Sequence, residues 1–195
     1  MNLLEIFFTK LNCLEGIRIE IKDNKIEQLS QQEYSGKRVY IIIKDDEGNV
    51  IESKTDLGVH AYMDIEQDTY CFDVCMDNEG ASLLINSCEQ IFAEKLRSLL
   101  RFGPLSTRYK DIFDFCYLKD HVDMLRLVDC IKAYIIDEPS MREKDMNSVR
   151  KRVTLTFSNR QFRRKVELSG DRNWLQIDVG VAFRMIQDFL ETVNL

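Results

Sequence analysis

The sequence contains 195 residues, of which 45% are hydrophobic and 31% are charged, and its formal net charge is −6. A chain of this length forms one domain, or one domain with a small appendage. The acidic balance excludes a general nucleic-acid coat, because blanket phosphate contacts need a basic excess, but it is compatible with a local basic site.

No stretch approaches the roughly 18–20 continuous apolar residues of a transmembrane helix. Residues 1–14 are partly apolar but are interrupted by Glu5 and Lys10, and they predict an amphipathic helix rather than a signal peptide. The six cysteines are scattered, without a Cys-x-x-Cys pair or histidines at ligand spacing. The cysteine pattern favours reduced thiols in a cytoplasmic protein. The absence of a predicted transmembrane helix leads us to expect no association with a membrane.

The first half of the sequence predicts β-strands. Residues 16–22 (GIRIEIK) alternate between apolar and polar, residues 38–44 (RVYIIIK) form a denser apolar run, and residues 50–56 alternate again after the turn cluster at residues 45–49. These segments predict an antiparallel β-hairpin unit. Further strands are predicted at residues 59–65, 69–76 and 81–85.

The hydrophobic period becomes helical after Ser87, which forms a capping box with Gln90. The helix that begins there is expected to end at Gly103-Pro104. Further helices are predicted from residue 106 or 107 to 118, at 122–136 and at 179–193. Residues 141–152 predict a short helix or a loop, and residues 153–157 predict a strand or an extended link.

Strands followed by helices indicate an α+β fold and not an alternating βαβ arrangement. The sheet is expected to be antiparallel or mixed, followed by a helical second half. We expect an α+β core over residues 1–120 and a helical region over residues 121–195 that packs on this core.

Residues 94–114 (EKLRSLLRFGPLSTRYKDIFD) gather the main candidates for chemistry. A short loop makes the two predicted helices pack nearly antiparallel, so Lys95 can meet the helix face that carries Arg108 and Asp111. In a functional interpretation, Lys95, Arg101 and Arg108 hold a triphosphate, while Asp111 orients Lys95 or a metal-bound water.

A structural interpretation of the same residues is surface ion pairing. Arg108 with Asp111 and Lys110 with Asp114 are ordinary helical pairs, each worth a few tenths of a kcal/mol. Spacing alone favours this interpretation.

Other features have structural interpretations. Trp174 is predicted to be a core or interface anchor, and His121 a surface or capping residue. The basic runs at residues 150–152 and 160–165 predict a solvated face, or alternatively an RNA-facing strip.

Two paired motifs carry a family resemblance. Ala93-Glu94-Lys95-Leu96 is followed by Arg108, Lys110, Asp111 and Asp114 in an Arg-x-Lys-Asp-x-x-Asp pattern, and Asp56-Leu57-Gly58 lies upstream. In order and spacing, these motifs resemble the late motifs of the nucleotidyltransferase AbiEii/AbiGii toxin family. The likeness is best over residues 16–118.

The resemblance implies a polymerase-β-like nucleotidyltransferase fold, truncated at its N-terminus. Family members are toxins of toxin–antitoxin or phage-defence pairs, and some transfer nucleotides from NTPs onto tRNA. The resemblance therefore implies an NTP substrate, Mg²⁺, a cognate antitoxin and a tRNA acceptor. The implied roles are catalytic for Lys95 and Asp111, phosphate-binding for Arg101, Arg108 and Lys110, supporting for Asp114 and metal-binding for Asp56.

One departure from the family pattern changes the prediction. The family's first motif, a Gly-Ser turn with an Asp-x-Asp pair, does not precede the hairpin in these 195 residues. Because Mg²⁺ needs several well-placed carboxylates, Asp56 alone would bind it weakly. We therefore expect an incomplete or inactive transferase when the chain is isolated. The alternatives are a non-catalytic protein-interaction module of a toxin–antitoxin or phage-defence system, and an RNA-binding domain.

Overall fold

The chain divides into two compact units, residues 1–63 and residues 64–195. Strands precede helices along the chain, which confirms the predicted α+β class. The predicted helix at residues 1–14 and most of the predicted strand at residues 59–65 fall outside the described residues. The computed structural model describes residues 16–28, 37–57, 65–72 and 81–195.

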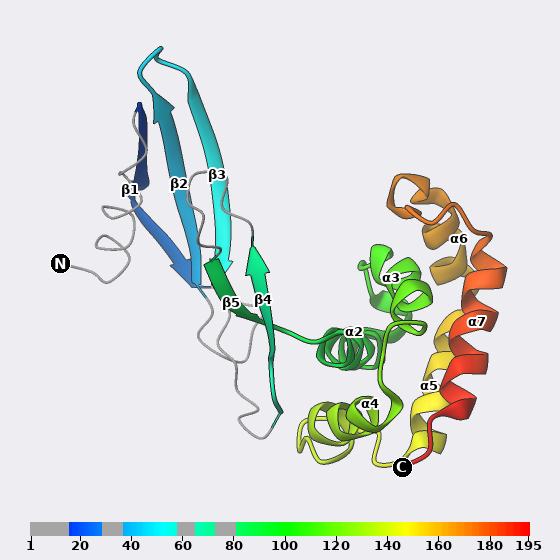
Figure 1. Ribbon diagram of the computed structural model, residues 1–195. Coiled ribbons are helices and arrows are strands. Elements are labelled where there is room, and N and C mark those ends of the chain that lie inside the picture. The colour runs from blue at the N-terminus through cyan, green and yellow to red at the C-terminus, as the bar shows by residue number, and fades with distance from the viewer. Residues whose placement is uncertain (1–15, 29–36, 58–64, 73–80) are drawn as a thin grey trace. The chain divides into compact units, whose positions relative to one another are not determined.

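The first unit contains a three-stranded antiparallel sheet in the order β1-β2-β3 (Figure 1). The three predicted strands are confirmed, and Ile43 of the central strand lies opposite Ile19 on one side and Ile51 on the other. Rows of β-branched side chains pack well on a pleated surface, so the alternating pattern fixes this register. The strands are β1 (Ile17–Gln28), β2 (Lys37–Asp45) and β3 (Val50–Leu57).

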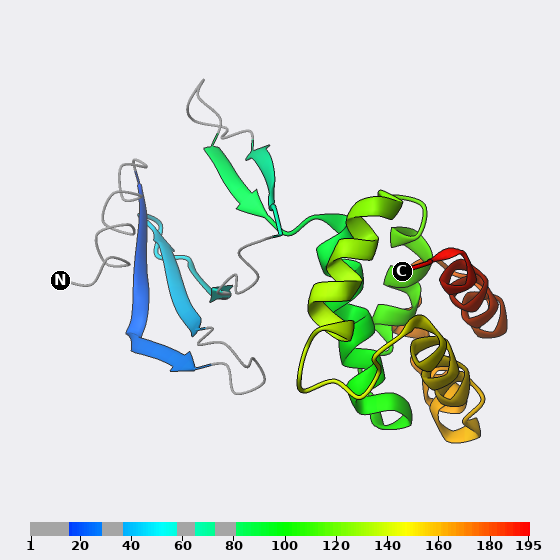
Figure 2. The same cartoon turned by 90° about the horizontal axis from the view of Figure 1, so that it is seen from below.

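Two local features shape this sheet. The pairing of β1 with β2 shifts register between Ile21 and Ile26, and β1 bends sharply (Figure 2). In the turn before β3, the Asp45 carboxylate accepts hydrogen bonds from the Asn49 side chain at 2.7 Å and the Asn49 backbone at 2.8 Å. The side-chain bond is the main cause that lowers the pKa of the Asp45 carboxyl. Gly48 supplies the left-handed backbone of this turn at φ 87°.

The second unit combines a two-stranded antiparallel ribbon with a set of packed helices (Figures 1 and 2). Arg126 donates a hydrogen bond to Asp68 at 2.9 Å and so joins the ribbon to the helices. The ribbon consists of β4 (Asp68–Phe72) and β5 (Ala81–Ile85). The helices are α2 (Cys88–Phe102), α3 (Lys110–Leu118), α4 (Met124–Ile131), α5 (Met146–Phe157), α6 (Arg160–Leu168) and α7 (Val179–Thr192). The short turns are η1 (Gly103–Leu105), the π-helical η2 (Lys132–Ile136) and η3 (Gly170–Arg172).

Aromatic side chains dominate the core of the second unit. The ring of Phe92 on α2 meets Phe115 of α3 edge-on at 4.9 Å and Phe189 of α7 at 5.4 Å. Phe157 of α5 stacks on Phe183 of α7 at 4.1 Å. Since such rings bury large apolar areas, these contacts hold α2, α3, α5 and α7 together.

One predicted element is wrong. Residues 153–157 are neither a strand nor an extended link but the end of α5. Val149, Val153 and Phe157 recur at the four-residue spacing of a helix face and all three are buried. Asp145 begins the helix, because its carboxylate accepts a hydrogen bond from the backbone N–H of Ser148 at 2.7 Å.

The other helix predictions hold with altered ends. The predicted helix from residue 106 or 107 begins instead at Lys110, and residues 106–108 form no helix between it and the 3-10 turn η1. The predicted division of the chain at residue 120 falls within the second unit and stays a prediction. None of the helices within the described ranges is both long and apolar enough to span a membrane.

Candidate functional site

Lys95 lies at the edge of the buried face of α2. The predicted capping box fixes the start of this helix, with the Ser87 hydroxyl accepting from the Gln90 backbone at 3.2 Å and the Gln90 side chain accepting from the Ser87 backbone at 2.8 Å. Leu96 and Leu99 are buried on the inner face. The Lys95 side chain is therefore held largely within the protein, at 16% exposure.

The Lys95 ammonium contacts two carboxylates of α3. Its Nζ lies 2.5 Å from Oδ1 of Asp111 and 2.9 Å from Oδ2 of Asp114. The two aspartates are three residues apart, which places them on one face of the helix. The predicted meeting of Lys95 with Asp111 is confirmed, and it is a direct, largely buried contact and not a surface pair.

Two more cations lie outside this contact. Arg108 Nε lies 2.8 Å from Oδ2 of Asp111, and Lys110 Nζ lies 3.8 Å from Oδ1 of Asp114. The side chains of Arg108 and Lys110 are 59% and 61% exposed. We call these five residues the Lys95 cluster; its three cations and two carboxylates give a net charge of +1. The two carboxylates of the cluster are therefore largely buried, whereas the cations of Arg108 and Lys110 are accessible to solvent.

The loop between α2 and α3 sets how these helices meet. Gly103 has φ 53° and ψ −131°, a backbone conformation that side chains other than hydrogen rarely allow. Arg152 lies against it and donates from Nε to the Leu100 carbonyl at 3.2 Å, which satisfies a carbonyl at the end of α2. A Cβ at Gly103 would lie 2.6 Å from the Arg152 guanidinium.

Two predicted site residues are not members of the Lys95 cluster. Arg101 is exposed in the last turn of α2. It lies six residues after Lys95, and because a helical turn takes about 3.6 residues, the two side chains point in different directions from the helix. The backbone of Asp56 lies in β3 opposite Arg38, in the first unit. The phosphate role of Arg101 and the metal role of Asp56 stay predictions.

Trp174 belongs to the site, which the sequence interpretation missed. It is 47% exposed, so of the two predicted positions, core or interface, the core position is wrong and the interface position stays a prediction. Its indole Nε1 donates to Oδ1 of Asp114 at 2.9 Å. The segment between η3 and α7 brings Trp174 to α3 across 60 residues of sequence. No local periodicity signals such a contact; an isolated tryptophan in a polar segment is the one hint that the sequence offers.

The Lys95 cluster does not fit a magnesium ion as it stands. Both carboxylates already accept from Lys95, with Arg108 and Lys110 beside them. A divalent cation would have to displace these donors. Throughout the described ranges, no group of three or more His, Cys, Asp or Glu side chains is placed to hold a metal.

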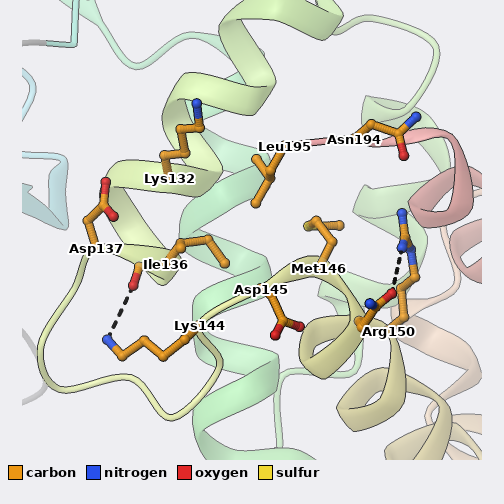
Figure 3. A pocket seen from close by; sticks show the side chains of 10 residues that line it. Lys132, Ile136, Asp137, Lys144, Asp145, Met146, Arg150, Asn194 and Leu195 are labelled. Atoms are coloured by element: carbon orange, nitrogen blue, oxygen red, sulfur yellow. Dashed lines mark hydrogen bonds between the residues drawn. The ribbon is translucent and has the colours of Figure 1, made fainter.

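A separate cavity of about 520 Å³ lies between η2, the start of α5 and the residues after α7 (Figure 3). Its cations contact backbone carbonyls. Lys144 donates to the Ile136 and Glu138 carbonyls at 3.2 and 2.8 Å, and Arg150 donates to those of Leu190 and Val193 at 3.0 and 2.7 Å. These bonds satisfy carbonyls at helix ends, so the cavity has a structural explanation.

The two predicted basic runs differ in the structure. Arg150 and Arg152 are partly buried against helix ends, so the first run is not a solvated face. In the second run, Arg160, Arg163 and Lys165 are exposed on α6 while Phe162 is buried. Exposed cations around one buried aromatic are typical of an amphipathic surface helix, as the solvated-face interpretation predicts.

The thiols that the structure describes are free. Burial raises the pKa of both Cys116 and Cys130 to about 11. A buried thiol with a raised pKa is a poor nucleophile, because the thiolate is the reactive form. These cysteines serve as small apolar residues, as predicted. The exposed His121 is a capping residue, since its Nδ1 lies 2.7 Å from the Tyr117 carbonyl near the end of α3.

Comparison with known proteins agrees with the geometry of the late motifs. No curated protein matches the chain significantly. The family model described as nucleotidyl transferase AbiEii toxin, type IV toxin–antitoxin system, matches residues 10–173. This match spans most of the sequence and contains all five residues of the Lys95 cluster. The chain therefore belongs to the AbiEii nucleotidyltransferase toxin family of type IV toxin–antitoxin systems.

Proposed function

We propose that the second unit handles the triphosphate of an NTP during nucleotidyl transfer. The observation that carries this proposal is the Lys95 ammonium held between Asp111 and Asp114. An ammonium has three N–H donors, and these two bonds use two of them. Among the contacts of the described residues the third donor has no partner, so it can bind a phosphate oxygen and stabilise the charge that develops during transfer.

Arg108 and Lys110 complete this phosphate-binding site. The Nε of Arg108 lies 2.8 Å from Asp111 and the side chain is 59% exposed, so a guanidinium with five N–H donors can also reach a phosphate oxygen. Lys110 is 61% exposed and lies 3.8 Å from its carboxylate, so it can turn toward a ligand at little cost.

In this proposal, Asp111 and Asp114 position the ammonium group of Lys95. Each carboxylate accepts from Lys95, so the amine is fixed on α2 and points toward α3. Hydrogen bonds to ionised groups are stronger than neutral ones, which lets two aspartates hold a flexible lysine in one geometry. This arrangement, in a polymerase-β-like fold, agrees with the late motifs of the family.

Asp56 is proposed to contribute one magnesium-binding carboxylate, and the other carboxylates are proposed to belong to another polypeptide segment. The isolated 195-residue chain is then a poor transferase, although it binds NTP. The proposed acceptor is tRNA, and the toxin–antitoxin family suggests an antitoxin as the protein partner.

Charge-removing variants of the two exposed cations test the proposal with little risk to folding. Arg108→Gln and Lys110→Gln are each expected to weaken NTP binding about five- to tenfold, the worth of one charge-assisted bond. Arg160→Gln and Lys165→Gln on α6 remove exposed charges elsewhere and serve as matched controls. Isothermal titration calorimetry with each NTP and Mg²⁺ measures the affinities.

Transfer itself is tested with labelled NTPs, Mg²⁺ and total tRNA, for the chain alone and with its genomic neighbours. Equal NTP affinities for the site variants and the α6 controls would contradict the phosphate-binding proposal. The Lys95 cluster would then be a set of ion pairs within a non-catalytic interaction module.

A further inference from the structure

Three aromatic side chains contact one another at the surface of the second unit. The rings of Tyr117 and His121 stack, with centroids 4.0 Å apart and planes at 19°. The ring of Trp174 lies 5.5 Å from that of Tyr117, with planes at 56°. Trp174 and Tyr117 remain 47% and 44% exposed. We call these three residues the aromatic corner; it presents ring surface to solvent.

The aromatic corner is joined to the Lys95 cluster through one carboxylate. Oδ1 of Asp114 accepts from the Trp174 indole, and Oδ2 accepts from the Lys95 ammonium, both at 2.9 Å. Lys110 lies near the same carboxylate. A ligand with its flat part on the rings therefore has cations within reach for a negatively charged part.

The corner is held in place by local structure on both sides. His121 and Tyr117 are one helical turn apart, and the His121 Nδ1 donates to the Tyr117 carbonyl at 2.7 Å. On the other side, the Asn173 side chain donates to the Ile177 carbonyl at 2.8 Å and accepts from the Ile177 N–H at 3.3 Å. The loop that carries Trp174 is thus closed, so both rings are fixed before any ligand arrives.

We propose that the aromatic corner binds the base of the nucleoside triphosphate whose phosphates the Lys95 cluster holds. This inference rests on the proposed function and adds the base subsite to it. Every nucleobase has a π-face that stacks on an aromatic ring, and such stacking tolerates different bases. The cations of the Lys95 cluster complement the phosphates of the same molecule.

The geometry favours one nucleotide over a strand of RNA. Single-strand binding proteins place aromatic rings in succession, so that consecutive bases stack along a groove. Here Trp174 and Tyr117 meet at 56°, and one face of Tyr117 is covered by His121. The corner thus offers a place for one base and no continuous track.

Trp174 is the single tryptophan of the chain, so its fluorescence reports on this corner alone. Titration with each NTP is expected to quench the emission and to saturate, whereas inorganic tripolyphosphate leaves it largely unchanged. Tyr117→Ala is expected to weaken NTP binding about tenfold, the worth of one stacked base. Tyr117→Phe keeps the ring and retains the affinity. Phe102→Ala, which removes another exposed aromatic ring of the same unit, leaves the affinity unchanged.

Three results would overturn the base subsite. These are quenching by tripolyphosphate equal to that by NTPs, an unchanged NTP affinity in Tyr117→Ala, and quenching by a single-stranded RNA at far lower concentration than by any NTP. The last result would mark the corner as an RNA contact.

Failure of the proposed function looks different from failure of the base subsite. Nucleosides and NTPs that quench Trp174 with equal affinity would retain the base subsite and remove the phosphate role of the Lys95 cluster. Tripolyphosphate that competes with labelled NTP, while no NTP affects Trp174, would retain the phosphate role and remove the base subsite.

Discussion

The Lys95 cluster and the cavity beside α5 both gather lysine, arginine and aspartate within residues 64–195, yet their cations are held differently. In the cavity, Lys144 and Arg150 donate to backbone carbonyls, and Arg150 also lies 3.3 Å from the Glu191 carboxylate. In the cluster, Lys95 and Arg108 contact carboxylates. The carbonyls at a helix end have no partner within the helix, so these bonds tie the cations of the cavity to the fold.

The carboxylates of the cluster position the three cations but leave part of each cation available to a ligand. Lys95 retains a donor, and Arg108 and Lys110 are more than half exposed. Similar residue types therefore stabilise the fold in the cavity and are available to a ligand in the Lys95 cluster. The hydrogen bonds of the cavity cations to backbone carbonyls, and not the composition of a charged patch, distinguish the two.

Lys95→Ala is expected to give the largest effect. It leaves Asp111 and Asp114 with weaker partners in a largely buried site, at a cost of about 2–3 kcal/mol in the free energy of unfolding. NTP affinity is expected to fall at least about tenfold, because a charge-assisted bond to phosphate is lost. Urea denaturation and calorimetry measure the two quantities. An unchanged NTP affinity in a folded variant would show that the cluster, like the cavity, only stabilises the fold.

Arg150→Ala sharpens the comparison from the other side. Its guanidinium satisfies the Leu190 and Val193 carbonyls, so removal is expected to cost about 2 kcal/mol and to lower the melting temperature by about 4–8 °C. NTP affinity stays the same, because no residue of the cluster lines the cavity. A loss of affinity comparable to that of Lys95→Ala would contradict the distinction between the two places.

Gly103→Ala tests the loop that sets the cluster. An alanine at φ 53° and ψ −131° is strained, and its Cβ would press on Arg152. The expected cost is on the order of 1–2 kcal/mol, measured by urea denaturation. Gly170→Ala is the matched control, since no atom lies within 4 Å of a Cβ built there. Equal stability of both variants would remove the argument for strain at Gly103.

The smallest expected effect is the pH dependence at Asp145, the cap of α5 at the rim of the cavity. The Ser148 backbone N–H is the main cause that lowers the pKa of this carboxyl from its ordinary value of 3.8. A carboxyl with a lowered folded-state pKa stabilises the fold above pH 3.8, and this contribution disappears as the pH falls through the folded-state pKa.

Asp145→Asn keeps a capping side chain without the titration. We expect the melting temperature of the natural protein to exceed that of the variant at pH 7 and to converge with it as the pH falls from 3.8 through the lower folded-state pKa. A difference that stays constant across this range would show that the charge of Asp145 does not matter.

Local pattern predicted most of the secondary structure. The alternation of residues 38–44 and the capping box at Ser87 identified β2 and α2, because each depends on neighbours a few residues apart. The failure at residues 153–157 has the same origin. Five mostly β-branched or apolar residues are compatible with a strand, and only the packing of Val153 and Phe157 against other helices selects a helix.

The sequence by itself determined the α+β order, the family motifs and the candidate pairing of Lys95 with the α3 aspartates. Tertiary structure alone decided that this pairing is largely buried, that Arg150 is committed to a helix end and that Trp174 reaches Asp114. The reason is physical: residue spacing shows which side chains share a helix face, whereas burial and the choice of acceptor depend on segments far away in the chain.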